Sequence, residues 1–212
     1  MSQPVKDRIS TGTDRRRRRR TMIKLVVPLG LRVSDHDFWR LCQLNPDLRL
    51  ERNASRELIV MPPAAPDSGH RNAGITAQLW NWNQKSGLGI DFDSSAGFTL
   101  PNTAIRGPDA SWITRARWDA LSRQEREKFS HICPDFVVEL RSKNDDMSTL
   151  RRKMEEYIAQ GIKLGWLIDP GGGTVEIYRP GQPVEILERP ATLSGEDVLP
   201  GFTLDLKGIL FD

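Results

Sequence analysis

The chain has 212 residues, of which 38% are hydrophobic and 28% charged, and its formal net charge is +3. This length and composition are typical of a globular protein, so we expect one domain plus a tail. Residues 1–24 hold nine Lys and Arg against two Asp, which leaves 22 Lys and Arg and 26 Asp and Glu in the remainder. The folded part is therefore expected to be acidic, and the overall basicity gives no argument that it binds nucleic acid.

The first 21 residues are polar and include six consecutive arginines, Arg15 to Arg20, which repel one another in any compact arrangement. We expect residues 1–21 to form a disordered basic tail. Two interpretations of this tail remain open. Either Met22 is the true first residue and the extension is irrelevant, or the tail adds affinity for nucleic acid without sequence information.

The sequence predicts neither export nor a membrane span. Lys24 and Pro28 interrupt the apolar run that follows the arginines, and no small-x-small cleavage site comes after it. Cys42 and Cys133 lack both the density of a disulfide scaffold and the CxxC spacing of a zinc site. We therefore expect a cytoplasmic protein with no membrane segment.

The first predicted helix covers about 34–45, where Ser34 is placed to cap it. Two short strands, near 48–52 and 56–61, are expected to form a hairpin. A longer helix over about 68–85 follows and ends at Gly87, a residue suited to the left-handed position after a helix.

From Gly89 the apolar period changes to two. Strands are predicted over 90–93, 97–100 and 106–113, and the last is entered through Gly107 and Pro108. Residues 115–130 are charged and helix-prone. The next expected elements are a strand at 136–140, a helix at about 148–160, a strand at 164–168 and a hairpin of 174–178 with 184–187, followed by a docked C-terminal segment.

The strand, helix and strand between 136 and 168 imply a right-handed crossover and parallel pairing. The expected fold class is therefore α/β, with antiparallel hairpins at both margins.

The strand "PDFVVELRS" contains one embedded carboxylate, Glu139. Alternation places Phe136, Val138 and Leu140 on one face and Glu139 with Arg141 on the other. A carboxylate inside an apolar strand is costly unless it is paired or bound to a cation. Two explanations follow, an ion pair with Arg141 or a metal.

A second embedded acid, Asp109, lies in another short apolar strand 30 residues upstream. Two such acids on neighbouring strands must repel each other or share a cation. Mg²⁺ fits this arrangement better than zinc because it prefers oxygen ligands. Glu57 is a further candidate ligand, although a surface-facing carboxylate is an equal alternative. His70 is expected to be capping or solvated rather than a ligand.

Hydrolysis of a phosphodiester also needs a cation near the attacking water. Arg141 lies on the face of Glu139, but a guanidinium does not lose its proton. Lys153 flanks the apolar stripe of the following helix, from where its amine could reach over the end of the strand or simply extend into solvent. The tryptophans, among them Trp80, Trp82 and Trp166, are expected to pack in the core.

Six stretches in a fixed order carry a resemblance to a known family. They are "RELIVMPP" (56–63), "FDSSAGFTLPN" (92–102), "GPDASW" (107–112), "PDFVVELRS" (134–142), "LRRKMEEYIAQGIKLGWLIDP" (150–170) and "LPGF" (199–202). Together they resemble the PD-(D/E)XK nuclease superfamily and, more closely, the Uma-type restriction endonuclease family. The resemblance extends over about residues 30 to 210, nearly all of the expected folded part.

The resemblance implies a restriction-endonuclease-like domain over 22–212, with a mixed β-sheet flanked by helices. It implies a DNA endonuclease in which Asp109 and Glu139 hold Mg²⁺, with Mn²⁺ as a substitute, and a lysine assists the water. The superfamily expects that lysine two residues after the glutamate, where this chain has Arg141. We therefore transfer the role to Lys153 and expect Arg141 to contact phosphate or to be structural, with Glu57 as an additional acid.

Two other hypotheses remain open. The fold could serve as a catalytically inactive module that binds DNA or assembles with itself, because fold does not imply function. A hydrolase of small molecules with the same metal site is the third reading. The hairpins at the sheet edges are compatible with a homodimer.

Overall fold

The computed structural model describes residues 31–211. The predicted basic tail over 1–21, with its six arginines and the alternative start at Met22, lies outside these residues.

The centre of the fold is a six-stranded sheet with the order β10-β9-β8-β7-β6-β3. Its strands are β3 (Gly89–Asp93), β6 (Ala110–Thr114), β7 (Phe136–Leu140), β8 (Leu164–Asp169), β9 (Thr174–Tyr178) and β10 (Glu185–Glu188). β7 and β8 are parallel and are connected by helix α5 (Met147–Gln160), while the other neighbours are antiparallel. The predicted parallel crossover is thus confirmed, and the sheet is mixed.

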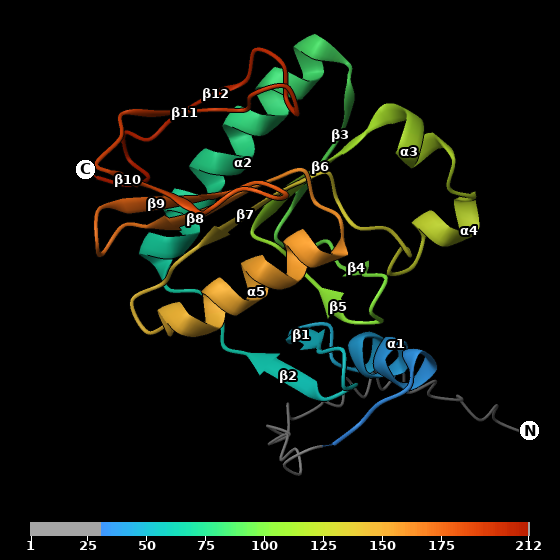
Figure 1. Ribbon diagram of the computed structural model, residues 1–212. Helices are drawn as coiled ribbons and strands as arrows, with labels where there is room; N and C mark the ends of the chain where they lie inside the picture. Colours follow the sequence, from blue (N-terminus) through green and yellow to red (C-terminus); the bar gives the residue numbers. More distant parts are fainter. Residues whose placement is uncertain (1–30, 212) are drawn as a thin grey trace, which may run out of the picture.

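Helices cover both faces of this sheet, α2 (Pro66–Ser86) on one and α5 on the other (Figure 1). Phe136, Val138 and Leu140 of β7 belong to the core cluster that includes residues of α2. Val137 belongs instead to the cluster formed with α5. The predicted alternation is therefore confirmed, and it places Glu139, two residues after Val137, on the α5 face.

A close approach of α5 to the sheet depends on Gly165 of β8. A Cβ atom at this position would lie 2.5 Å from the terminal methyl of Met154 and 2.8 Å from the Ile162 side chain. A larger residue here would force the ends of these two side chains to move aside. Gly165 thus leaves room for Met154 of α5 to pack directly on the sheet.

A second sheet of four short strands, in the order β2-β1-β5-β4, lies beside the first. Its strands are β1 (Arg49–Arg52), β2 (Leu58–Met61), β4 (Phe98–Thr99) and β5 (Ile105–Arg106). Helix α1 (Asp35–Leu44), capped by Ser34 as predicted, packs against it through Phe38. This sheet brings the N-terminal hairpin to the end of the main sheet where β6 begins and β7 ends.

The prediction of one strand over 106–113 is wrong, because the chain changes sheets at Gly107 and Pro108. β5 ends before this pair and joins the small sheet, whereas β6 begins after it and joins the main sheet. Proline cannot donate a ladder hydrogen bond, and the N–H of Gly107 donates to the carboxylate of Glu51, 3.0 Å away. Asp109 therefore stands in the link between the two sheets.

The remaining elements cover the edges. The helix-prone stretch 115–130 forms two short helices, α3 (Arg115–Asp119) and α4 (Arg123–Arg126). The docked C-terminal segment is a ribbon of β11 (Thr192–Ser194) and β12 (Thr203–Asp205) whose apolar residues join the core cluster on the α2 side. Among the described residues, no helix is both long and apolar enough to cross a membrane.

Candidate active site

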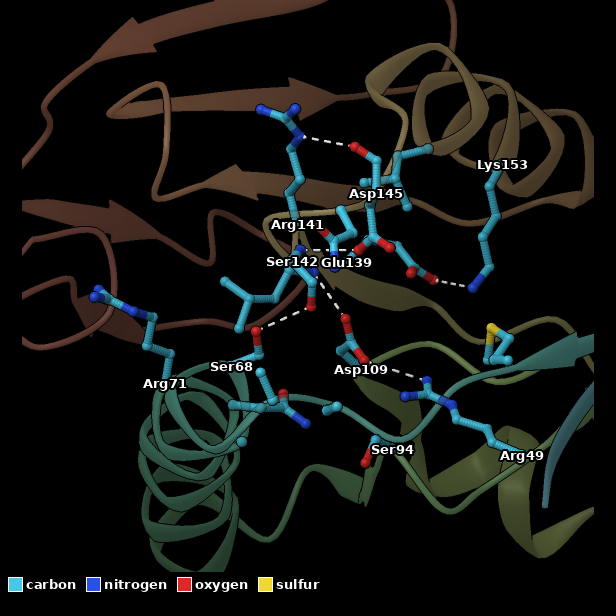
Figure 2. A pocket seen from close by; sticks show the side chains of 18 of the residues that line it. Arg49, Ser68, Arg71, Ser94, Asp109, Glu139, Arg141, Ser142, Asp145 and Lys153 are labelled. Atoms are coloured by element: carbon cyan, nitrogen blue, oxygen red, sulfur yellow. Dashed lines mark hydrogen bonds and ion pairs between the residues drawn. The ribbon is translucent and has the colours of Figure 1, made fainter.

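One cleft of about 1770 Å³ opens where the two sheets meet, and we call it the central cleft. Its walls come from β1 and β2, the part of α2 up to Trp80, the ends of β7 and β8, the loop 141–146 and the start of α5. Figure 2 shows that Asp109, Glu139 and Lys153 converge in it from different elements. The three residues that the sequence assigned to chemistry therefore share one cavity.

Asp109 lies immediately before β6 and close to Glu139 of the neighbouring strand β7. β6 and β7 pair Ala110 with Val138 in antiparallel register, and the N–H of Asp109 donates to the carbonyl of Val138 at 3.0 Å. Oδ2 of Asp109 also accepts from the N–H of Leu140 at 2.9 Å, so its carboxylate lies beside the backbone that follows Glu139. The negative charge of Asp109 is close enough to raise the pKa of Glu139, and the two carboxylates are therefore neighbours.

The carboxylate of Asp109 is held at both oxygens. Its Oδ2 accepts from the N–H of Leu140 at 2.9 Å, and its Oδ1 accepts from Nη2 of Arg49 at 3.2 Å. Nη2 of Arg49 also donates to the carbonyl of Gly107 at 2.9 Å. These contacts fix the side chain and leave lone pairs on both oxygens, because each carboxylate oxygen can accept more than one bond.

Lys153 reaches Glu139 from α5, a helix whose first turn is capped by Asp146. Its Nζ lies 2.8 Å from Oε1 of Glu139 and 2.9 Å from Oε1 of Glu51. Tyr157, one turn further along α5, donates its hydroxyl to the same Oε1 of Glu139 at 3.1 Å. Lys153 is therefore held between two acids, with 11% of its side chain exposed, and does not simply extend into solvent.

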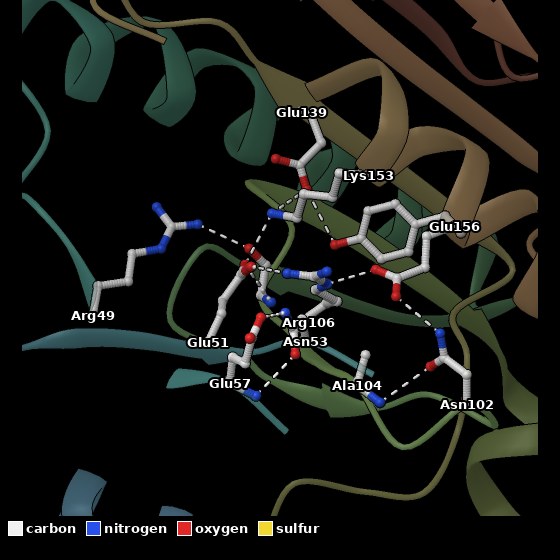
Figure 3. Close-up of polar contacts among 12 residues, drawn as sticks. Arg49, Glu51, Asn53, Glu57, Asn102, Ala104, Arg106, Glu139, Lys153 and Glu156 are labelled. Carbon is white, nitrogen blue, oxygen red and sulfur yellow. Dashed lines mark hydrogen bonds and ion pairs between the residues drawn. The ribbon is translucent and has the colours of Figure 1, made fainter. Parts of the chain in front are cut away.

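Glu51 of β1 is a site residue that the sequence reasoning missed. It is only 3% exposed and accepts from Lys153, from Nη1 of Arg106 at 3.1 Å and from the N–H of Gly107 (Figure 3). Arg106 in turn donates from Nε to Glu156 of α5 at 2.6 Å. A signal was present, since Glu51 is an acid within a short strand, like Glu139.

The structure does not bring Glu57 to the central cleft. This residue lies at the turn of the hairpin, where Nδ2 of Asn53 donates to its carboxylate at 2.6 Å. It pairs with neither Lys153 nor Glu139 among the described residues. His70 lies on the exposed side of α2 and is not part of the cleft wall, in line with the solvated role expected for it.

Arg141 does not neutralise Glu139. β7 ends at Leu140, and the guanidinium of Arg141 turns to β8, where Nη1 lies 2.9 Å from Oδ2 of Asp169. Its Nε donates to the carbonyl of Asp145 at 3.2 Å. Of the two explanations for the embedded glutamate, the ion pair with Arg141 is therefore wrong, and the partner within the described chain is Lys153.

Burial and charge shift the proton affinities at this site. Burial raises the pKa of Glu139 from 4.5 to about 7, with Lys153 opposing the rise and Asp109 and Glu51 adding to it. Burial also disfavours charge on Glu51, but Lys153 and Arg106 outweigh it and hold its pKa below the ordinary value. Burial works against charge on Lys153, yet Glu139 and Glu51 raise its pKa above the ordinary value. Lys153 is therefore a charged ammonium at neutral pH.

The donor set fits a hard divalent cation. Mg²⁺ is usually bound by one or two carboxylates, with waters and phosphate oxygens completing its shell. Asp109 and Glu139 supply two carboxylates, and Oε2 of Glu139 receives no hydrogen bond from residues 31–211. No group of three or more His, Cys, Asp or Glu in that part of the chain could hold a metal ion alone. The site suits an ion that shares its shell with water or substrate, and it does not suit zinc.

Comparison with known proteins agrees with this fold. The crystal structure of "a putative nuclease belonging to DUF820" from Anabaena variabilis superposes with a TM-score of 0.65 at 20% sequence identity, over 76% of this chain and 89% of that chain. No curated protein matches the chain significantly. The model of the family Uma2, described as "Putative restriction endonuclease", matches residues 35–207. Because this match covers most of the sequence, the chain belongs to the Uma2 family, as its ordered motifs predicted.

Proposed function

We propose that this protein is a divalent-cation-dependent endonuclease that hydrolyses phosphodiester bonds in DNA. The observation that carries the proposal is that Asp109 and Glu139 lie close together inside a cleft that also holds the ammonium of Lys153. Membership of the Uma2 family supports a nuclease. The cation, the DNA substrate and the residue roles are inferred from the chemistry of the site.

Asp109 and Glu139 would hold the ion, which we expect to be Mg²⁺ or Mn²⁺. A bound ion of this kind supplies Lewis-acid stabilisation of a phosphate and lowers the pKa of a coordinated water. Arg49 and the N–H of Leu140 orient Asp109 for this task. Glu139 would offer Oε2, the oxygen that is not engaged by Lys153 or Tyr157.

Lys153 would provide positive charge next to the reacting phosphate. Because its pKa is raised above the ordinary value, it orients the attacking water by donating hydrogen bonds and does not remove the proton of that water. Glu51 would act as a positioning residue, since it holds Nζ of Lys153 from the side opposite Glu139. Arg141 would be structural, in its pair with Asp169.

The charge of the cleft makes the cation necessary for substrate binding as well. The lining includes seven Lys and Arg against nine Asp and Glu, a formal charge of −2. A phosphate backbone is repelled by such a surface until a divalent ion offsets the excess. We therefore expect DNA to bind weakly in the presence of a chelator and more tightly when Mg²⁺ is added.

A second candidate function is a nucleic-acid-binding module without turnover. One observation favours it, because the Lys153 ammonium already neutralises Oε1 of Glu139 at 2.8 Å and so competes with a metal ion. In this reading the acids stabilise the packing of α5 against the two sheets. Metal binding separates the two candidates.

The decisive experiment measures cleavage and metal binding by the same preparations. Supercoiled plasmid is incubated with the protein in Mg²⁺, in Mn²⁺ and in EDTA, and Mn²⁺ binding is followed by calorimetry. We expect nicking only with metal, and loss of both nicking and Mn²⁺ binding in Asp109→Asn, whose unfolding midpoint serves as the control for folding. Mn²⁺ binding that is unchanged in Asp109→Asn, or no cleavage of any DNA by the parent, would contradict the nuclease assignment.

A further inference from the structure

Trp80 differs from the other five tryptophans of the chain. Trp39, Trp82, Trp112, Trp118 and Trp166 each contact another aromatic ring. Trp80 has no ring contact with any described residue, and it is 52% exposed. The expectation that Trp80 packs in the core is therefore wrong, whereas Trp166 is fully buried and Trp82 packs against the core.

Trp80 lies on α2 and forms part of the wall of the central cleft. Its neighbours one and two turns earlier on the same side of the helix are Ala77, Thr76 and Ala73, and all three also line the cleft. These side chains are too small to cover an indole ring. The ring thus remains accessible within the cavity that contains Asp109 and Glu139.

Trp80 lies well along α2 from the end of the helix that meets the loop after β7. At the start of the helix, Ser68 is linked by a hydrogen bond of 3.0 Å between hydroxyl groups to Ser142, just after β7 (Figure 2). Trp80 follows twelve residues later, which is about 18 Å along a helix axis. It therefore lines a different part of the cleft wall from the Ser68–Ser142 contact.

An exposed tryptophan in a polar cleft has a specific use in proteins that bind nucleic acids. An indole ring stacks on the face of a nucleobase, and the interaction tolerates any base because every base has such a face. We propose that Trp80 is a stacking platform for an unpaired nucleobase of the substrate. This inference rests on the proposed function of the same cleft and adds the class of nucleic acid that the cleft takes.

The substrate class follows from the geometry of the bases. In a continuous duplex both faces of each base are covered by its neighbours, so a tryptophan could stack only after unstacking them. A single strand, a flap or a bulge presents a free face without that cost. The structure therefore assigns the protein to nucleic acids that carry an unpaired segment, in preference to fully paired DNA.

The test compares Trp80→Ala and Trp80→Phe with the parent on three fluorescein-labelled DNAs: a single strand, a duplex with an unpaired flap, and a duplex without one. Binding in Mg²⁺ is measured by fluorescence anisotropy, and cleavage is measured as kcat and KM. Ile186→Ala is the matched control, because Ile186 is 57% exposed on β10 and lies outside the cleft.

We expect the parent to prefer the two DNAs with unpaired bases. Trp80→Ala should weaken their binding by about tenfold or more, the range expected from loss of one stacked base, with the effect on cleavage falling on KM rather than kcat. Trp80→Phe should retain most of the affinity, and Ile186→Ala all of it.

The two proposals fail in different ways. Equal affinity of Trp80→Ala and the parent for the flapped DNA, or parent preference for the fully paired duplex, would overturn the stacking role while the nuclease assignment stands. A change in oligomeric state in Trp80→Ala, without a change in affinity, would also overturn it. If the parent binds the single strand through Trp80 but cleaves nothing, the stacking role holds and the nuclease assignment fails.

Discussion

Two buried glutamates of this protein look alike and behave differently. Glu139 of β7 and Glu176 of β9 lie in one row of the main sheet, because both are paired in register with Leu167 of β8. Each is 3% exposed, and each accepts a hydrogen bond from a tyrosine hydroxyl. Each also pairs with a cation of α5, and the two cations are only two residues apart along that helix.

The difference lies in how completely each carboxylate is used. Arg151 donates from Nε and Nη2 to Glu176, and Tyr178 donates to its second oxygen. This carboxylate is saturated by its own chain, and it is not part of the central cleft. Glu139 receives bonds on Oε1 alone, lies next to Asp109 and has a pKa raised to about 7. A buried acid thus becomes available to a ligand when its partner leaves one oxygen open.

The largest expected difference between the two glutamates is in cleavage. Glu139→Gln should lower the rate of plasmid nicking by at least about a thousandfold, because the loss of a metal ligand removes several kcal/mol of transition-state stabilisation. Glu176→Gln should nick within a few-fold of the parent. Both variants are assayed at one Mg²⁺ concentration after their unfolding midpoints confirm folding. An equal loss of nicking in both variants would show that Glu139, like Glu176, has a structural role.

The second difference is in how stability depends on pH. Because the pKa of Glu139 rises from 4.5 to about 7 on folding, the folded state holds a proton in this window that the unfolded state has released. The free energy of unfolding therefore falls as pH rises from about 4.5 to about 7, by about 3 kcal/mol in all. Urea denaturation in EDTA should show this decline in the parent and in Glu176→Gln, but not in Glu139→Gln. Parallel profiles for all three would contradict the raised pKa.

A smaller effect is expected on stability at neutral pH. Glu176→Gln should lower the free energy of unfolding by about 2 kcal/mol, since it removes the charge that Arg151 contacts through two nitrogens. Glu139→Gln should be close to neutral or stabilising, because the isosteric amide removes an acid whose charge burial disfavours. Thermal unfolding at pH 7.5 in EDTA checks the order. Greater destabilisation by Glu139→Gln would reverse the comparison.

The smallest effect is expected at Glu57, the acid that the family resemblance suggested as an additional site residue. Glu57→Gln should change the free energy of unfolding by less than about 0.5 kcal/mol and leave nicking at the parent rate, because its partner Asn53 can still bond to an amide. The same two assays apply. A loss of nicking comparable with that of Glu139→Gln would place Glu57 back in the site.

The sequence allowed Asp109 and Glu139 to be found because an acid inside a short apolar strand is conspicuous. Alternation along β7 places Glu139 on the α5 face, and the pairing of β6 with β7 brings Asp109 next to it. Lys153 could be predicted for a similar reason, because its helix α5 is the first element after β7 in the sequence. For these residues short-range patterns determine the geometry.

Glu51 was missed because its burial depends on distant partners. Lys153 and Arg106 lie 102 and 55 residues further along the chain, and no local pattern announces either contact. Glu57 was predicted in place of Glu51 for the same reason. The side of the hairpin that meets the cleft is fixed only when the small sheet docks, and the local sequence does not show it. Trp80 was misjudged because helical spacing indicates which side of α2 meets the sheet but not what lies beside the other sides.

The ion pair between Glu51 and Lys153 joins the N-terminal hairpin of the small sheet to α5, the helix that covers one face of the main sheet. Before these two parts of the chain dock, Lys153 has no second acid to hold it. The N–H of Gly107, two residues before Asp109, then also lacks the carboxylate of Glu51 as its acceptor. Under the proposed function, a chain in which these two parts have not yet docked would carry every reactive side chain but would lack the contact that positions Lys153.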